Sequence, residues 1–367
     1  MAEIRIKNLH KGFGDFTAVR DSSLVLEDGK FVVLLGPSGC GKTTTLRMIA
    51  GLEYPTSGQI MLDSEDVTYR RPRERDIAMV FQLFALYPHM RVRENLSFPL
   101  KNEGLPKKVI DERIKEVAAI LHIEHLLDSR VGGLSGGDRQ RIALGRAIVR
   151  KPKAFLMDEP LGTLDAEFRE LMCIELRKLH ERLGATTVFV THDQNEAMAL
   201  ADHIVVMNKG DILQADTPEG IYNYPRTKFV ANFIGRPPMN FLQVSGRVAN
   251  GADSIQVGGG EIRVPRALAD SDDATLGIRP EHVQFSDGGA LRGCVARSEY
   301  FGSHWIVNVE TSAGIIKVHG AKHACPAEGD HVGLAFNTAR AVLFDNGSDV
   351  LLPSATTVEH KTGMRHG

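Results

Sequence analysis

The chain has 367 residues, of which 43% are hydrophobic and 25% are charged, so it holds enough apolar material for one large or two ordinary globular domains. Its formal net charge is −2, and a chain without a basic excess is not expected to be a dedicated nucleic-acid binder. The four cysteines form no CxxC pair, which argues against a disulfide framework or a cysteine zinc site. No apolar run approaches the ~18 residues that span a bilayer, and the first residues lack the apolar core of a signal peptide. We therefore expect a soluble chain.

Strands and helices are predicted to alternate through the first part of the chain. Residues 1–35 are predicted to form strands and turns, with a buried strand at 31–35, where five apolar residues lie between two glycines. Further strands are predicted at 76–81, 154–157, 187–190 and 204–207. Helices are predicted at 42–51, 107–128, 138–150, 166–183 and 194–201. This alternation is typical of a parallel sheet covered by helices on both faces.

The pattern changes after about residue 236, where Gly235-Arg-Pro-Pro238 interrupts the chain. Beyond it, short alternating runs are separated by turn residues, which predicts a small antiparallel β-barrel or sandwich. The polar tail after Pro353 is expected to fray. We therefore expect two domains, 1–236 and 237–367. The short runs lie at 241–248, 254–257, 261–264, 275–285, 291–299, 304–310, 314–319 and 331–336.

A phosphate-binding loop is predicted between the strand at 31–35 and the helix at 42–51. The sequence GPSGCGKT fits G-x-x-x-x-G-K-[ST], and its glycines let backbone N–H groups turn toward phosphates at a helix N-terminus. Lys42 is expected to reach the β- and γ-phosphates, and the Thr43 hydroxyl to bind Mg²⁺. Cys40 is interpreted as a loop filler, because no base or resolving thiol is evident. The expected ATP-binding residues here are Gly36, Pro37, Ser38, Gly39, Cys40, Gly41, Lys42, Thr43 and Thr44.

Polar side chains follow three of the predicted strands. Asp158 is suited to hold Mg²⁺ through water, and Glu159 to polarise the water that attacks the γ-phosphate. Such a pair often only caps a helix, but the P-loop favours the metal and base roles. The amide of Gln82 is expected to contact Mg²⁺ or the attacking water. His192 is expected to bond the γ-phosphate and to hold Glu159 in position.

A second phosphate-binding element is predicted at Leu134-Ser-Gly-Gly-Asp138, which opens the helix at 138–150. Ser135 is placed as the N-cap and Asp138 as the third helical residue, which predicts a capping box. The charge of Asp138 suits the positive end of the helix dipole.

The order P-loop, Gln82, Ser135-Gly-Gly137, Asp158-Glu159, Asp165 and His192 resembles the nucleotide-binding subunit of ATP-binding cassette (ABC) transporters, over nearly the whole chain. The resemblance implies an α/β P-loop NTPase cassette with a parallel core sheet, an antiparallel β subdomain and a helical subdomain at about 88–150. It also implies that Leu134–Gly137 is the family signature, that Leu161–Asp165 is the D-loop, and that Thr191-His192 is the switch. Phe13 then stands where the family stacks an aromatic ring on adenine, with Phe16 as the less favoured candidate.

Subunits of this family pack head to tail, so the resemblance implies a homodimer with two composite ATP sites. The residues contributed to the partner's site would be Ser135, Gly136, Gly137 and Asp138. The chain departs from the family at two positions: Asp138 stands in place of the usual Gln, and Gly162 in place of the usual Ser of the D-loop. The second departure removes a hydroxyl that would bond across the dimer.

The C-terminal part narrows the resemblance. The segments 217–222, 235–242 and 276–282 look like those of the ATPases of bacterial carbohydrate importers of the maltose, multiple-sugar and glycerol-3-phosphate type. The resemblance implies that 237–367 is an all-β, OB-like (TOBE-type) regulatory domain; a purely structural barrel is the alternative. The implied partners are two membrane permease subunits and, indirectly, an extracytoplasmic solute-binding protein. The chain would then lie peripherally on the cytoplasmic face of the bacterial inner membrane, and no nucleic acid is expected.

The function implied is an ATPase that uses ATP and Mg²⁺ to drive uptake of a carbohydrate or a related polyol or sugar phosphate. The apolar loop 83–90 is expected to contribute to docking on the permease. A soluble, non-transport cassette ATPase of the repair or translation type is the alternative, but such proteins typically carry coiled-coil insertions or a second cassette. A non-catalytic regulatory cassette is disfavoured by Lys42, Asp158, Glu159 and His192. The pair His122 and His125 is expected to face solvent without binding metal.

Overall fold

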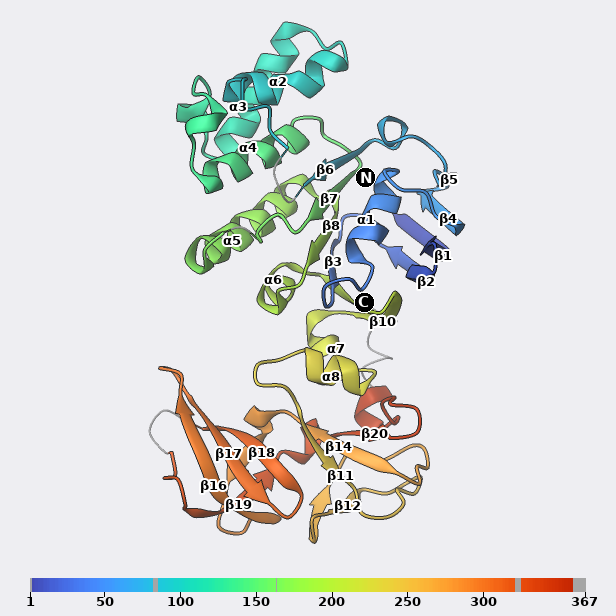
Figure 1. Ribbon diagram of the computed structural model, residues 1–367, viewed down its shortest axis with the longest axis vertical. Coiled ribbons are helices and arrows are strands. Elements are labelled where there is room, and N and C mark those ends of the chain that lie inside the picture. Colours follow the sequence, from blue (N-terminus) through green and yellow to red (C-terminus); the bar gives the residue numbers. More distant parts are fainter. Residues whose placement is uncertain (1, 82–84, 163, 321–324, 359–367) are drawn as a thin grey trace. The chain divides into compact units, whose positions relative to one another are not determined.

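The computed structural model describes residues 2–81, 85–162, 164–320 and 325–358. The chain divides into two compact units, Met1–Pro218 and Glu219–Gly367 (Figure 1). This division falls before the Gly235-Arg-Pro-Pro238 interruption, so the helices that follow Pro218 group with the C-terminal unit. The domain boundary at residue 236 stays a prediction.

A six-stranded sheet forms the centre of the first unit, in the order β10-β9-β3-β8-β7-β6. All neighbouring strands are parallel except β10, which is antiparallel to β9. The predicted strands are confirmed, and β10 was not foreseen. The strands are β3 (Phe31–Leu35), β6 (Ile77–Val80), β7 (Ala154–Asp158), β8 (Thr186–Thr191), β9 (His203–Asn208) and β10 (Asp211–Asp216).

Helices bury both faces of this sheet, as predicted. On one face, Val32, Leu156 and Val190 share a hydrophobic core with Leu46 and Ile49 of α1 (Lys42–Ala50). The alternate residues Phe31, Phe155 and Met157 face α5 (Ala166–Leu183). The short helix α6 (Gln194–Leu200) follows β8 and contacts both β8 and β3. Because side chains alternate along a strand, apolar residues at consecutive positions fill both layers.

A second, antiparallel sheet shares the α1 side of the core. Its strand order is β2-β1-β4-β5, and Ile4, Ile6 and Ile60 from it pack in the same cluster as Leu46. The strands are β1 (Ile4–Phe13), β2 (Phe16–Leu26), β4 (Ser57–Leu62) and β5 (Glu65–Asp66).

Three helices form the helical part of the first unit: α2 (Val92–Asn102), α3 (Lys107–Ile120) and α4 (Gly136–Ile148). Helix α2 was not predicted, since Pro99 lies inside it; Leu96 and Leu100 are buried, and their burial outweighs the local cost of the proline. The prediction of a helix through residue 128 was wrong at its end. The chain leaves the helix at His122, whose φ is 54°, and Ile123 becomes buried beyond that turn.

The second unit is predominantly β. It begins with α7 (Pro218–Asn223) and α8 (Lys228–Phe233) and continues in three antiparallel sheets, ordered β11-β14-β20, β12-β13 and β15-β19-β16-β17-β18. One hydrophobic cluster, including Leu276, Val307 and Leu334, joins all three sheets. The all-β character predicted for this region is confirmed. The strands are β11 (Asn240–Gln243), β12 (Ser254–Val257), β13 (Gly260–Arg263), β14 (Ala274–Ile278), β15 (Val283–Phe285), β16 (Leu291–Tyr300), β17 (Trp305–Thr311), β18 (Gly314–Gly320), β19 (His331–Phe336) and β20 (Val342–Asp345).

Arg279 ties α7 and α8 to the β strands within this unit. Its buried guanidinium donates to the carbonyl oxygens of Tyr222, Ala231 and Ile234 and lies over the Tyr222 ring. A buried cation with several carbonyl acceptors is stabilised without a carboxylate partner. The helices after Pro218 therefore belong structurally to the β unit.

Candidate active site

The P-loop connects β3 to α1 in a conformation that requires glycine. Gly39 and Gly41 have φ values of 78° and 105°, which strongly favour glycine. A Cβ on Gly36 would lie 2.2 Å from the carbonyl oxygen of Met207, and one on Gly41 would lie 2.4 Å from that of Ala18. Glycine is thus required in this motif for two separate reasons: the positive φ of the backbone and the close approach of backbone carbonyl oxygens from other segments.

The Lys42 ammonium is folded over the loop that precedes it. Its Nζ donates to the carbonyl oxygens of Gly36 at 2.8 Å and Pro37 at 3.0 Å. These neutral acceptors position a cation over the backbone cradle, where it can exchange carbonyl oxygens for phosphate oxygens. The geometry fits a triphosphate, because loop N–H groups and a cation are provided together.

Cys40, a residue of the loop itself, is buried, and this burial raises the pKa of its thiol even though Lys42 acts in the opposite direction. Its backbone carbonyl accepts from the Gly210 N–H at 3.1 Å. A protonated, buried thiol is unreactive, which agrees with its interpretation as a filler.

Thr43 and Asp158 meet across the site. The Thr43 hydroxyl donates to Asp158 Oδ1 at 2.8 Å, and burial raises the pKa of Asp158, although this hydrogen bond and the nearby Arg47 lower it. One hydroxyl and one carboxylate side by side fit Mg²⁺, which commonly takes one or two protein oxygens and completes its shell with phosphate and water.

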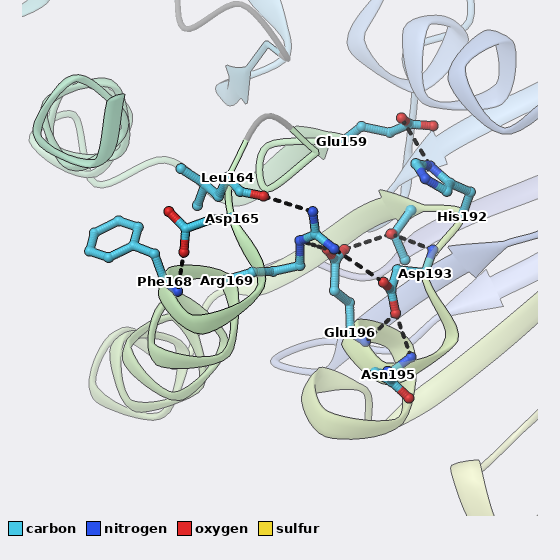
Figure 2. A network of polar contacts seen from close by, with 10 residues as sticks. Glu159, Leu164, Asp165, Phe168, Arg169, His192, Asp193, Asn195 and Glu196 are labelled. Carbon is cyan, nitrogen blue, oxygen red and sulfur yellow. Dashed lines mark hydrogen bonds and ion pairs between the residues drawn. The ribbon is translucent and has the colours of Figure 1, made fainter. Parts of the chain in front are cut away.

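Glu159 turns away from Asp158 because its backbone is left-handed. Its φ is 45°, and its N–H donates to the Val190 carbonyl at 3.0 Å, beyond the end of β7. Its Oε2 lies 3.2 Å from Nδ1 of His192 (Figure 2). A non-glycine residue with positive φ is a strained position of a kind that gathers at functional sites. The sequence predicted the contact of Glu159 with His192 but not the backbone turn that allows it.

Sheet order explains why these residues meet. β3 lies beside β8, and β8 beside β7, all parallel, so their carboxyl ends share one edge of the sheet. That edge carries the P-loop, Asp158, Glu159 and His192. Gln82, which was predicted to join them, lies outside the described residues.

Phe13 lies at the end of β1, paired in register with Phe16 of β2. Both rings are exposed, and the Lys11 ammonium lies 4.7 Å from the Phe13 ring centroid. Further along β2, Ala18 borders Gly41 of the P-loop. The same sheet thus carries both exposed aromatic rings and the residue that borders the loop.

Ser135 caps helix α4. Its Oγ accepts from the Asp138 N–H at 3.2 Å, and its hydroxyl donates to Asp138 Oδ2 at 2.7 Å. Asp138 therefore returns its bond to the cap hydroxyl instead of to the cap backbone. Its other oxygen accepts from Arg141 at 2.7 Å, so an arginine one turn along compensates its charge.

The signature segment is separate from the P-loop within one subunit. Across the described ranges, no hydrogen bond or ion pair joins residues 135–138 to residues 36–44. Gly137 instead borders α5, where a Cβ on it would lie 2.3 Å from the Phe168 ring.

Asp165 caps α5 by accepting from the Phe168 N–H at 2.9 Å. Thr163, between Leu161 and Asp165 of the predicted D-loop, lies outside the described residues. Near this cap the structure reveals polar residues that sequence reasoning missed: Arg169, Asp193 and Glu196. The one available signal was Asp193, an acidic residue placed to cap the helix that follows β8.

No helix in the described part of the chain is long and apolar enough to cross a bilayer. The described residues likewise contain no cluster of three or more His, Cys, Asp or Glu that would hold a metal by itself. His122 and His125 are both exposed.

Three family models match successive parts of the chain. Residues 19–162 match the ABC transporter model, 235–283 the MalK OB fold domain, and 276–344 the TOBE domain. These matches and the folds described above confirm the predicted cassette followed by an OB-like domain.

Curated relatives match nearly the whole chain. It is 45% identical over 364 residues to the trehalose/maltose import ATP-binding protein MalK of Thermococcus litoralis, covering 94% of this chain and 98% of that protein. It is 52% identical over 294 residues to the sn-glycerol-3-phosphate import ATP-binding protein UgpC of Rhizobium meliloti, covering 79% and 81%. It is 43% identical over 350 residues to the sulfoquinovosyl glycerol transport ATP-binding protein SmoE of Agrobacterium fabrum, covering 94% and 98%.

Solved structures of ABC transporter cassettes match about three fifths of the chain. The dimeric structure of MJ0796, a bacterial ABC transporter cassette, matches with a TM-score of 0.53 and 31% identity, covering 59% of this chain and 98% of that one. The non-transport cassette alternative is not favoured, because the chain matches 81% to 98% of the length of relatives that are named as import or transport proteins. The chain belongs to the ABC transporter family as an ATP-binding subunit of the importer type, an ATPase that acts with membrane permease subunits.

Proposed function

We propose that this ATPase drives uptake of a carbohydrate or of a related polyol or sugar phosphate. The proposal is supported by the substrates in the names of the three relatives: trehalose and maltose, sn-glycerol-3-phosphate, and sulfoquinovosyl glycerol. These compounds share a polyhydroxylated carbon skeleton. We therefore assign the transported solute to the class of polyhydroxylated compounds.

In the proposed hydrolytic site, Lys42 and the N–H groups of the P-loop bind the β- and γ-phosphates. Thr43 and Asp158 hold Mg²⁺, which supplies charge neutralisation for the phosphates. Glu159 orients and deprotonates the attacking water, and His192 holds Glu159 and bonds the γ-phosphate. Phe13 would stack on adenine, and Gln82 is the residue expected to contact Mg²⁺ or the attacking water.

The observation that carries this assignment is the contact of Glu159 with His192 at 3.2 Å, on the same sheet edge as the Thr43–Asp158 pair. A carboxylate held by an imidazole, next to a hydroxyl–carboxylate pair on a P-loop, provides a base and a metal site as separate groups. One carboxylate could not serve both purposes, since a metal-bound oxygen is a poor base.

We also propose that two copies form a homodimer in which Ser135, Gly136, Gly137 and Asp138 of one subunit complete the ATP site of the other. The separation of these residues from the P-loop within one chain supports this arrangement. ATP then closes the dimer and hydrolysis reopens it, a two-state change driven by differential binding. Asp165 belongs to the D-loop at the same interface.

Docking on two permease subunits is proposed at a hollow of about 220 Å³ beside the loop 85–90. Tyr87, Phe98 and Arg150 line it, and Arg146 both lies over the Tyr87 ring at 5.3 Å and donates to the Ala85 carbonyl at 2.8 Å. Aromatic rings beside cations suit the end of a short helix, whose carbonyl groups attract positive charge. The chain would thus lie peripherally on the cytoplasmic face of the inner membrane, with a solute-binding protein acting on the far side.

The catalytic assignment is tested by Glu159→Gln. We expect turnover to fall by at least about a hundredfold, as for loss of a positioned general base, while ATP binding is retained and ATP-bound dimer accumulates. Steady-state ATPase assays, ATP-binding titration and light scattering measure the three quantities. Glu170→Gln, an exposed carboxylate on α5, is the matched control and should behave like the parent chain. Retained turnover in Glu159→Gln would assign the base elsewhere.

The substrate class is tested by uptake. Cells that lack only this subunit should lose uptake of one radiolabelled oligosaccharide, polyol or sugar phosphate and regain it with the parent gene but not with the Glu159→Gln variant. Loss of amino-acid or metal-ion uptake instead would reject the assigned class.

A further inference from the structure

Arg169 occupies a junction between the D-loop and the segment that carries His192. Its Nη2 donates to the Leu164 carbonyl at 2.8 Å, and its Nη1 donates to Asp193 Oδ2 at 3.4 Å. Its Nε lies 3.5 Å from Glu196 Oε1. One guanidinium thus joins the residue before the α5 cap to the first turn of α6 (Figure 2).

These contacts close a ring that passes through the proposed catalytic pair. Glu159 and Leu164 belong to one segment of the chain, and the Leu164 carbonyl accepts from Arg169. Arg169 also donates to Asp193, whose neighbour His192 contacts Glu159, so the series of contacts closes on itself. The start of the segment that leads from Glu159 to Leu164 is also held by a hydrogen bond, since the Gly162 N–H donates to the Glu159 carbonyl at 3.3 Å. Arg169 is the side chain that links the D-loop to the switch in this ring.

The rest of the junction is held by hydrogen bonds of Asp193 and Glu196. Asp193 caps α6 by accepting from the N–H groups of Asn195 and Glu196. Glu196 is only 4% exposed and accepts from the Thr191 hydroxyl at 2.6 Å. The side chain of His192, in contrast, is 58% exposed. Its position is therefore set mainly by its backbone neighbours, Thr191 and Asp193, both of which belong to this network.

We propose that Arg169 is a positioning residue that transmits the placement of the D-loop to His192 and so to Glu159. This inference rests on the proposed roles of Glu159 and His192. A planar guanidinium can serve a carbonyl and two carboxylates at once, whereas an ammonium is a point charge without that fork geometry. Small displacements of positioned groups lower turnover steeply, so the effect is expected on kcat and not on ATP binding.

A second arginine of the same helix provides a matched control. Arg177 donates to the Leu200 carbonyl at 3.0 Å and pairs with Glu181 at 3.1 Å and Asp202 at 2.9 Å. Its side chain is 33% exposed and that of Arg169 is 29% exposed. Both arginines thus bind one carbonyl and two carboxylates, but only Arg169 touches the D-loop and the switch.

The experiment compares Arg169→Met, Arg169→Lys and Arg177→Met in the full-length chain, measuring kcat, KM for ATP and melting temperature. We expect Arg169→Met to lower kcat by at least about tenfold with KM within about threefold of the parent. Arg169→Lys should regain part of kcat. Arg177→Met should lower the melting temperature to a similar extent and leave kcat within about twofold. Equal kcat losses in the two Met variants, or no loss in Arg169→Met, would overturn the proposal.

A double variant separates positioning from simple charge compensation. In Arg169→Met, Glu196 and Asp193 are left facing each other, which destabilises the fold. Adding Glu196→Gln removes one of the charges, so the melting temperature should recover while kcat stays low. Recovery of kcat together with stability would reduce Arg169 to a structural counter-ion. If Glu159→Gln keeps its turnover, the proposed base fails independently, whatever the arginine variants do.

Discussion

At the scale of single residues, the site depends on a few polar contacts whose partners are far apart in sequence. Thr43 meets Asp158, and Glu159 meets His192. Asp138 is the exception, since both of its partners are local. It accepts from Ser135 and from Arg141, so its charge is compensated within its own subunit.

This compensation leads to a prediction for Asp138→Gln. A glutamine oxygen can still accept from the Ser135 hydroxyl, while the ion pair with Arg141 is lost. We expect kcat for ATP to change by no more than about fivefold, equivalent to ~1 kcal/mol, because partly exposed pairs of this kind contribute little. Steady-state ATPase assays measure the change. Arg141→Gln, which breaks the same ion pair from the other side, should likewise change kcat by no more than about fivefold. A complete loss of activity in Asp138→Gln would contradict the capping role.

At the scale of elements, the start of α4 is fixed by its packing on α5. Gly137 and Gly136 are neighbours in the first turn, but their surroundings differ. A Cβ on Gly137 would lie 2.3 Å from the Phe168 ring, whereas one on Gly136 would have no described neighbour within 4 Å. The two glycines therefore have different structural requirements although the motif treats them alike.

The corresponding prediction compares Gly137→Ala with Gly136→Ala. Overpacking against Phe168 should destabilise the Gly137→Ala chain by about 1–3 kcal/mol, and Gly136→Ala should be neutral or slightly stabilising, since alanine favours helix. Thermal unfolding of the full-length variants measures both. Combining Gly137→Ala with Phe168→Leu makes room for the methyl group and should recover part of the loss. Equal stabilities of the two alanine variants would mean that α4 shifts freely on α5.

The helical elements also mark the limit of what periodicity predicts. Helix α5 was predicted with its bounds, and the structure places Asp165 and Gly184 at its two ends as caps. Helix α3 was extended too far, because buried apolar residues continue at Ile123 and Leu126 beyond the left-handed residue His122. Helix α2, which contains Pro99, was not predicted. The apolar pattern thus identified buried positions correctly but not where a helix stops.

At the scale of the whole molecule, no hydrogen bond or ion pair among the described residues joins the signature residues to the P-loop of the same chain. If two chains complete each other's sites, a defect in the P-loop and a defect in the signature should complement when placed on different subunits. The parent for this test is the Glu159→Gln chain, in which the ATP-bound dimer is expected to persist.

The prediction concerns Lys42→Ala and Ser135→Arg, each introduced into the Glu159→Gln chain. In a homodimer of either variant, neither composite site would be intact, so each variant alone should stay monomeric with ATP. Their mixture contains pairs with one intact composite site, and these should form dimers in the presence of ATP, as binding energy from one site is regained. Light scattering after gel filtration measures the dimer fraction. A mixture as monomeric as its components would argue against shared sites.

The sequence by itself determined which residues are chemically capable and which elements carry them. The glycine spacing, the strand before it and the helix after it are local properties, and so is the Ser135–Asp138 cap of α4. They are encoded in neighbouring residues and can therefore be recognised without a structure.

Only the tertiary structure decided how those residues are arranged. The order of the sheet brings Glu159 to His192, the left-handed backbone of Glu159 turns it from Asp158, and the packing of α5 puts Phe168 against Gly137. Arg169 carries no sequence motif of its own, and its contacts arise because α5 and α6 begin side by side. Contacts between segments distant in the chain depend on the global packing, for which local propensity gives no rule.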